Sequence, residues 1–254
     1  MEQRALLVFA DSAHTDCKRR GWSGTFRILL ETQVLGFGEL AGFHVHLFTS
    51  HGSRHMVPPS YQVHHQEGAS FGQRLEHAIA CLAGIGYEEI VIVGSDCPDL
   101  EQSDISNAFE LLERHRVVLG PDHRGGCYLI GFHSRDLSQF KGIRWQRNTD
   151  FLQILERFGK QAVCKLPVKI DLDSLRDIWL LARSRSQWSI VAKLLKELLL
   201  NRQFFSPPTE KILSHRESKR ILAAPASGDS NPVVEARSSF GCAKRLYKLG
   251  ELGA

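Results

Sequence analysis

The stretch IVIVGSDCPDLE, residues 90–101, sets the pattern of the fold. Four β-branched residues in a row are typical of a strand that is buried on both faces, and Gly94 ends the run. Two carboxylates follow, Asp96 and Asp99, at the point where a parallel sheet usually binds its ligands. A carboxylate is costly to bury without a partner, so we expect a cation, a hydrogen-bond network or solvent beside it.

Short apolar runs alternate along the chain with longer stretches whose apolar residues recur every three or four positions. Such alternation is typical of β-α-β units and a mostly parallel sheet. Ser103 is expected to cap a helix, and Gly36 and Gly86 are expected to end helices. The sequence predicts strands over 5–10, 43–49, 89–94, 116–120 and 127–132. It predicts helices over 24–36, 70–86, 103–115, 148–158, 175–182 and 187–200, and an extended segment over 162–173.

The composition, with 254 residues, 43% hydrophobic and 24% charged, is that of a globular protein with one substantial core. The formal charge of +4 comes from the end of the chain: residues 1–200 carry 23 Lys and Arg against 23 Asp and Glu, and residues 201–254 carry 9 against 5. A balanced body argues against a nucleic-acid surface. Proline, serine and basic residues recur after residue 200 and predict a flexible basic tail.

The cysteines and the start of the chain bear on location. The six cysteines have no spacing typical of a zinc site or a redox pair, which indicates reduced thiols and a cytoplasmic protein. The apolar stretch over 5–10 is short and has no cleavage site after it, and no apolar run is long enough to span a bilayer. We therefore expect neither a secretory signal nor a transmembrane segment.

The carboxylate of Asp96 can serve either of two purposes. Hard cations such as Mg²⁺ or Mn²⁺ bind carboxylate oxygens and share their remaining positions with phosphates, so Asp96 can anchor a metal-bound nucleotide. The alternative, which the pattern alone favours, is that Asp96 caps the following turn through backbone amides and Asp99 starts a helix. Pro98 stiffens the loop in both cases.

Four ordered stretches of the chain resemble the bacterial glycosyltransferase-like family DUF2064. They are QEGASFGQRLEHAIACLAGIGYEEIVIVGSDCPDL (66–100), VVLGPDHRGGCYLIGF (117–132), FKGIRW (140–145) and KIDLDSLRDI (169–178). The resemblance implies a GT-A-like fold, which is the three-layer α/β/α architecture of nucleotide-diphospho-sugar transferases. It also implies that Asp96 helps to hold a divalent metal, Mg or Mn, on the nucleotide diphosphate.

The second stretch departs from the family pattern. The family has Asp-Gly-Gly-Tyr on the acceptor side of the cleft; this chain keeps Gly125 and Gly126 but has Arg124 in place of the acid and Cys127 in place of the aromatic residue. A glycine pair lets backbone N–H groups approach a substrate, although a tight turn between strands is equally compatible with it. An arginine can clamp a phosphate but cannot act as a base or bind a metal.

The first loop also departs from the family, which carries Lys-Thr-Arg-Leu there for the phosphates of the donor. This chain reads DSAHTDCKRRGWSG over 11–24, so Lys18, Arg19 and Arg20 keep the charge without the motif. The resemblance implies that these three residues bind the donor, and a solvated basic turn is the alternative.

The fourth stretch resembles the family pattern Asp-x-Asp-(Thr/Ser)-x-x-Asp. On an extended segment Asp171 and Asp173 would face opposite sides, so we expect only one of them to reach the site. Ser174 is expected to cap the next helix, with Asp177 at its third position. Trp145 follows the family pattern and is expected to border the acceptor pocket, although it can also simply pack in the core.

The sequence thus predicts a GT-A-like catalytic domain over 1–183, a C-terminal helical extension over 184–200 and the tail over 201–254. The expected reaction is metal-dependent transfer of a sugar from a nucleotide-sugar to a small-molecule acceptor, which Asp99, Asp171 or Asp173 would orient or deprotonate. Two alternatives stay open. One is a nucleotidyltransferase that releases pyrophosphate, although the first loop lacks an early glycine-rich stretch. The other is a non-catalytic nucleotide-binding descendant, which the altered first loop and Arg124 suggest.

Overall fold

The computed structural model describes residues 3–10, 37, 42–50 and 58–183. The helices predicted over 24–36 and 187–200, the stop at Gly36 and the tail over 201–254 therefore lie outside the described residues. The same is true of the three basic residues expected to bind the donor, Lys18, Arg19 and Arg20.

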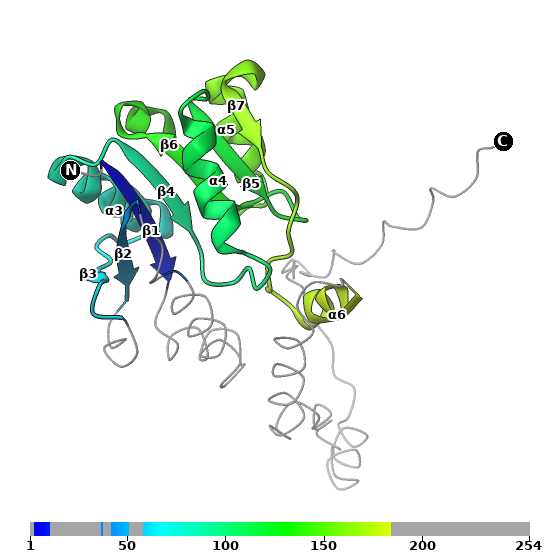
Figure 1. Cartoon of the computed structure of the whole chain (residues 1–254). Helices are drawn as coiled ribbons and strands as arrows, with labels where there is room; N and C mark the ends of the chain where they lie inside the picture. The colour runs from blue at the N-terminus through cyan, green and yellow to red at the C-terminus, as the bar shows by residue number, and fades with distance from the viewer. Residues whose placement is uncertain (1–2, 11–36, 38–41, 51–57, 184–254) are drawn as a thin grey trace, which may run out of the picture. The chain divides into compact units, whose positions relative to one another are not determined.

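Seven strands form one mixed sheet in the order β3-β2-β1-β4-β6-β5-β7 (Figure 1). Strand β6 runs antiparallel to its neighbours β4 and β5, and the other neighbouring pairs are parallel. Strands β1, β4, β5 and β7 consequently point the same way, and the loops that follow them meet at one edge of the sheet. The strands are β1 (Arg4–Ala10), β2 (His44–Thr49), β3 (Gln62–His65), β4 (Glu89–Val93), β5 (Val117–Pro121), β6 (Cys127–His133) and β7 (Val163–Lys165).

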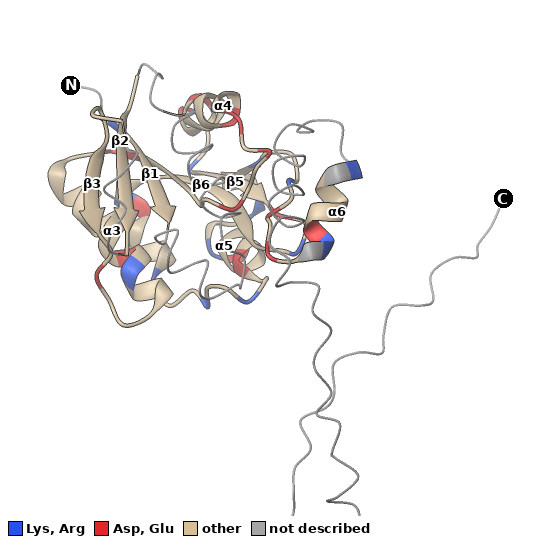
Figure 2. Ribbon diagram, turned by 90° about the horizontal axis from the view of Figure 1, so that it is seen from below, with Lys and Arg blue, Asp and Glu red and all other residues tan. Residues whose placement is uncertain are grey.

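Helices cover both faces of the sheet (Figure 2). Helices α3 (Phe71–Ile85) and α5 (Asp150–Phe158) pack on one face, and α4 (Gln102–Leu112) packs on the other. The remaining described elements are α6 (Leu175–Arg183) and the 3₁₀ helices η1 (Ser134–Phe140) and η2 (Lys160–Ala162). This three-layer α/β/α arrangement with a mostly parallel sheet confirms the predicted fold class.

Strand β4 lies between β1 and β6, away from both edges of the sheet, which explains its uninterrupted apolar run. Ile90 and Ile92 pack in the core beneath α3 and α5, whereas Val91 and Val93 pack in the core beneath α4. All four side chains are nearly or fully buried. Since burying such a side chain is worth about 1.5–3 kcal/mol, this strand is one of the main contributions to both cores.

Helix α3 begins and ends where the sequence indicates. Ser70 Oγ accepts the Gln73 N–H at 3.2 Å, and Gln73 Oε1 accepts the Ser70 N–H at 3.2 Å, which together form a capping box. Gly86 ends the helix at φ 109°, a left-handed conformation that glycine adopts without strain. The predicted N-cap of α4 is wrong, although the helix itself is confirmed: the N-cap is Glu101 rather than Ser103, and Asp104 Oδ2 accepts the Glu101 N–H at 2.8 Å.

Two short elements differ from the prediction. The sequence does not predict β3, because it is an edge strand whose side chains are mostly exposed and carry no apolar alternation. The extended segment predicted over 162–173 forms a strand only at β7, followed by a single bridge between Asp122 and Lys169. In the described part of the chain, no helix has the length and apolar character needed to cross a membrane.

Candidate functional site

A pocket of about 420 Å³ opens at the edge of the sheet where β1, β4, β5 and β7 end. Its walls come from the loops after β4, β5 and β7, from the segment before α5, and from apolar side chains of β1, α3, β4 and β6. Figure 2 views the sheet from this edge and shows acidic segments in red on several of the loops. The charged side chains that line the pocket, among the described residues, are Asp96, Asp122, Arg124, Asp150, Asp171 and Asp173.

Asp96 lies on the loop after β4 and is fixed to the segment before α6. Its carbonyl oxygen accepts the N–H of Leu172 at 2.8 Å, and the Leu172 side chain is fully buried. The two residues beside Leu172, Asp171 and Asp173, both line the pocket with Asp96. A Cβ at Gly94 would lie 2.9 Å from Asp96 Oδ1, so the glycine leaves the room that this carboxylate occupies.

Lys169 ties the same loops together. Its Nζ donates to the carbonyl oxygen of Asp99 at 2.6 Å and to Asp104 Oδ2 at 2.5 Å. Its backbone N–H donates to the carbonyl oxygen of Pro121 at 3.2 Å. The side chains of Lys169 and Asp104 are only 15% and 13% exposed, so the ion pair is partly shielded from water. One lysine thereby joins the loops that follow β4, β5 and β7.

Asp122 organises the turn between β5 and β6. Its Oδ1 accepts the backbone N–H groups of Arg124, Gly125 and Gly126 at 2.6, 2.8 and 2.9 Å. Gly125 has a φ of 102°, and a Cβ at this position would lie 2.5 Å from the carbonyl oxygen of Asn148. The N–H groups of the glycine pair are therefore bonded to Asp122 rather than offered to a substrate, which corrects the functional interpretation of this pair.

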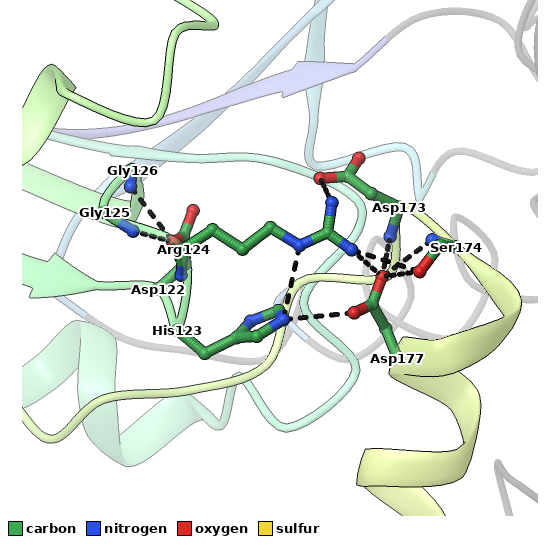
Figure 3. A network of polar contacts seen from close by, with 8 residues as sticks. All are labelled: Asp122, His123, Arg124, Gly125, Gly126, Asp173, Ser174 and Asp177. Carbon is green, nitrogen blue, oxygen red and sulfur yellow. Dashed lines mark hydrogen bonds and ion pairs between the residues drawn. The ribbon is translucent and has the colours of Figure 1, made fainter. Parts of the chain in front are cut away.

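Arg124 extends from that turn to the first turn of α6 (Figure 3). Its guanidinium pairs with Asp177, and it also pairs with Asp173 at 3.1 Å and donates to Ser174 Oγ at 3.2 Å. His123 Nε2 lies 3.0 Å from Asp177 Oδ1. Arg124 is thus an internal counter-ion for two carboxylates, Asp173 and Asp177, and it lines the pocket together with Asp173.

Asp177 is the most deeply buried member of this network, at 1% exposure. Its Oδ2 accepts the N–H of Ser174 at 2.7 Å and the N–H of Asp173 at 3.0 Å, as a capping carboxylate at the third helical position does. Burial raises the pKa of Asp177, but the Arg124 guanidinium and the Ser174 hydroxyl lower it more, to about 2. The carboxylate is therefore charged at neutral pH and holds the start of α6 against the turn.

Asp150 and Trp145 also line the pocket. Asp150 is the first residue of α5 and is 9% exposed, and its Oδ1 has no hydrogen-bond partner among the described residues. The same holds for Nε1 of Trp145. Burial raises the pKa of Asp150 to about 6; the backbone N–H groups of Gln146 and Arg147 act in the opposite direction, and the nearby Asp122 adds to the rise.

The pocket brings together most of the residues selected from the sequence that the structure describes. Asp99 and Gly125 are not among the residues that line it. Asp171 and Asp173 both line it, so the expectation that only one would reach the site is wrong; the chain leaves the strand after Lys165, and the alternation of side chains no longer applies. The selected residues that line the pocket are Asp96, Arg124, Gly126, Trp145, Asp171 and Asp173.

Two pocket carboxylates, Asp122 and Asp150, were not selected from the sequence. The position of Asp122 could have been recognised, because an aspartate two to four residues before a glycine pair commonly accepts the N–H groups of its own turn. No sequence pattern marks Asp150 as a pocket residue, because only the folded chain buries its side chain beside the turn that holds Asp122.

A divalent ion fits part of this donor set. Among the described residues, no three His, Cys, Asp or Glu side chains gather closely enough to form a metal site made by the protein alone. Asp96 and Asp171 nevertheless line one pocket, and magnesium usually binds through one or two carboxylates and completes its shell with water and phosphate oxygens. The carboxylates of the pocket therefore suit a divalent ion whose remaining ligands come from a diphosphate and water.

Gly126 is expected to tolerate no side chain. A Cβ at this position would overlap Asp122 Oδ2, so Gly126→Ala should push Asp122 away from the three N–H groups that it accepts. We expect the free energy of unfolding, measured by urea denaturation, to fall by about 2 kcal/mol. Gly84→Ala is the matched control, because a Cβ inside α3 at this position meets nothing within 4 Å; it should raise stability by about 0.5–1 kcal/mol. Equal effects of the two substitutions would contradict this interpretation of the turn.

Comparison with known proteins supports the resemblance drawn from the sequence. Residues 41–147 match the model of a family described as "Uncharacterized protein conserved in bacteria (DUF2064)". No curated protein matches the chain. The matched residues include Asp96, the turn of Asp122 and Trp145, and end before Asp150.

Several solved structures share the fold. A candidate nucleotide-diphospho-sugar transferase from Desulfovibrio desulfuricans G20 is 25% identical, with a TM-score of 0.66 over 80% of this chain and 99% of that protein. A cytidylyltransferase from Leptospira borgpetersenii is 11% identical, with a TM-score of 0.51 over 80% of this chain and 96% of that protein. A Mycobacterium tuberculosis H37Rv protein, solved in complex with manganese, is 14% identical, with a TM-score of 0.50 over 72% of this chain and 99% of that protein.

Proposed function

We propose that this protein is a metal-dependent transferase that moves a sugar from a nucleotide-sugar to a small acceptor. One observation carries the proposal: the bond between the Leu172 N–H and the Asp96 carbonyl brings the carboxylates of two distant segments, Asp96 and Asp171, into a single pocket at the edge where the strands end. Sheets of this kind bind nucleotides at that edge. The candidate transferase from Desulfovibrio desulfuricans supports the same substrate class.

In this proposal Asp96 and Asp171 hold Mg²⁺ or Mn²⁺ together with the diphosphate of the donor. When bound, the ion offsets the negative charge that builds on the departing diphosphate. The manganese complex of the Mycobacterium tuberculosis protein is in keeping with this assignment. The two carboxylates bind the ion and set the position of the donor, and the surrounding loops, tied by Lys169, keep them in place before substrate arrives.

Arg124 contributes to this site through its neighbours rather than by clamping a phosphate alone. Its guanidinium already pairs with Asp173 and Asp177, and it keeps the segment that carries Asp171 against the turn of Asp122. The basic residues of the first loop, Lys18, Arg19 and Arg20, are proposed to add positive charge toward the donor, as the resemblance to the family implies.

Product analysis tests the proposal. The full chain is incubated with UDP-, GDP- and dTDP-glucose and, separately, with the four nucleoside triphosphates, in each case with Mn²⁺ or with EDTA. We expect release of a nucleoside diphosphate from one nucleotide-sugar, with Mn²⁺ only. Release of pyrophosphate from a triphosphate would instead identify a nucleotidyltransferase, as in the cytidylyltransferase of similar fold. Metal-dependent nucleotide binding without any product would identify a non-catalytic binding protein, and no binding at all would contradict every one of these functions.

A further inference from the structure

Asp150 occupies a position in the pocket that the proposed metal site does not use. It is 9% exposed, it begins α5, and its Oδ1 lacks a hydrogen-bond partner among the residues described. A buried acceptor without a partner costs free energy, so native proteins usually satisfy such a group with water, an ion or a ligand, or use it in catalysis. Asp150 also lies beyond the residues that the family model matches, which end at 147.

The turn beside Asp150 brings a second carboxylate close to it. A Cβ at Gly126 would overlap Asp122 Oδ2 and lie 3.7 Å from Asp150 Oδ2, so the absent side chain leaves the room that the Asp122 carboxylate occupies near Asp150. Asp122 Oδ1 accepts three backbone N–H groups, which hold this carboxylate in place. Gly126, Asp122 and Asp150 all line the pocket.

Trp145 contributes an aromatic side chain to the same pocket. Its Cδ1 lies 2.8 Å from the position of a Cβ at Gly72, and its ring is 6.4 Å from that of Phe71, so packing on α3 fixes its orientation. Its Nε1 has no acceptor among the described residues. A pocket that offers both an aromatic ring with one N–H and a carboxylate suits a neutral ligand carrying hydroxyl groups.

The charges of the described residues around Asp150 disfavour an anion beside it. Asp122 and Asp150 are adjacent, and Arg124 directs its guanidinium away from them toward Asp173 and Asp177. The thiol of Cys127 adds no positive charge, and burial together with the carboxylates of Asp122 and Asp150 raises its pKa well above the ordinary value. A phosphate or carboxylate would therefore be repelled here, whereas a hydroxyl can donate its proton to either acid.

We propose that the part of the pocket beside Gly126 and Asp150 binds the hydroxyl of the acceptor, and that Asp150 is the base that removes its proton. This assignment rests on the proposed function. The acceptor oxygen forms a bond to the anomeric carbon of the donor sugar, the bond from that carbon to the diphosphate breaks, and the nucleoside diphosphate leaves with the bonding electron pair. The hydroxyl proton passes to the carboxylate of Asp150 and from there to solvent.

The electrostatics of Asp150 suit this role. Burial is the main reason that its pKa rises to about 6, with a further rise from Asp122, and the N–H groups of Gln146 and Arg147 limit the rise. A base whose pKa lies just below neutral is largely ionised at pH 7 and still takes up a proton readily. The rate should therefore fall as the pH drops through about 6, where this carboxyl becomes protonated.

The test uses water as the acceptor, because slow hydrolysis of the donor needs no knowledge of the natural acceptor. Release of UDP, GDP or dTDP from the corresponding nucleotide-glucose is followed between pH 5 and 8.5 with Mn²⁺, for the unchanged protein, Asp150→Asn and Glu156→Gln. Glu156 is an exposed carboxylate on the same helix and serves as the matched control. Binding of the nucleoside diphosphate with Mn²⁺ is measured for each protein by titration calorimetry.

Asp150→Asn should bind the nucleoside diphosphate with an affinity within about twofold of that of the unchanged protein. It should hydrolyse the nucleotide-glucose at least about 100-fold more slowly, and its rate of hydrolysis should not fall below pH 6. Glu156→Gln should match the unchanged protein in binding, rate and pH profile. If Asp150→Asn hydrolyses the donor at the normal rate with the normal pH profile, the role of Asp150 is refuted and the proposed function stands. If the unchanged protein neither binds nor hydrolyses any donor, the proposed function fails first and the role of Asp150 falls with it.

Discussion

Arg124→Met is expected to lower the free energy of unfolding by about 3 kcal/mol at pH 7, which is a large share of the stability of a domain of this size. The substitution leaves the carboxylate of Asp177, 1% exposed, without its cation. The hydrogen bonds from the N–H groups of Ser174 and Asp173 remain, but they cannot offset the removal of a charge from water. Urea denaturation followed by circular dichroism measures the change.

The loss should depend on pH in a defined direction. In the unchanged protein the pKa of Asp177, about 2, lies below its ordinary value, so its contribution to stability is present above about pH 4 and is lost as the pH falls toward 2. In Arg124→Met, burial should instead raise the pKa of this carboxyl, and protonation should relieve the penalty at mildly acidic pH. The difference between the two proteins should therefore be smaller at pH 5 than at pH 7.

Two further variants separate charge from packing. The double variant Arg124→Met/Asp177→Asn should recover most of the lost stability, because it no longer buries an unpaired charge. Arg176→Met, which removes an exposed arginine from the first turn of the same helix, should change stability by no more than about 0.5 kcal/mol. A loss in Arg124→Met that matches the loss in Arg176→Met, or that does not change with pH, would contradict the role given to this ion pair.

The sequence is a good guide to this fold where apolar periodicity is strong. The run over residues 90–93 and the helical patterns of α3 and α5 are long or regular enough to place the elements, because burial on defined faces dictates them. Edge strand β3 escapes prediction because its side chains are mostly exposed. The N-cap of α4 is not predicted correctly, because glutamate is an unusual N-cap residue and Glu101 serves as one through its reciprocal bonds with Asp104.

The sequence predicts the residues of the candidate site less completely than it predicts the fold. Asp96 can be found from its place after a buried strand, and Asp171 from the resemblance to the family. The pairing of Arg124 with Asp177 cannot be found in this way, because it depends on how the segment before α6 lies beside the turn of Asp122. For the same reason, the sequence gives no sign that Asp150 is buried in the pocket.

Asp96→Asn is expected to have the second large effect, this time on binding. The amide keeps the size of the side chain but removes its charge, and a neutral oxygen is a far weaker ligand for Mg²⁺ or Mn²⁺. Substitution of a residue that only supports a metal ligand usually lowers the affinity for the metal about 10- to 100-fold. Loss of the ligand itself should therefore weaken Mn²⁺-dependent binding of a nucleoside diphosphate by at least about 100-fold. The fold should be kept, because the Leu172 N–H bonds to the backbone carbonyl of Asp96 and not to its side chain.

The most direct measurement is the binding of Mn²⁺ itself. Electron paramagnetic resonance counts free Mn²⁺ in solutions of the full chain with UDP, GDP, CDP or dTDP, for the unchanged protein, Asp96→Asn and Asp150→Asn. We expect that one of the four nucleotides makes the unchanged protein and Asp150→Asn bind one Mn²⁺ ion, and that Asp96→Asn binds none under the same conditions. Equal binding of Mn²⁺ by the unchanged protein and Asp96→Asn, or no binding with any nucleotide, would contradict the placement of a shared metal ion at Asp96.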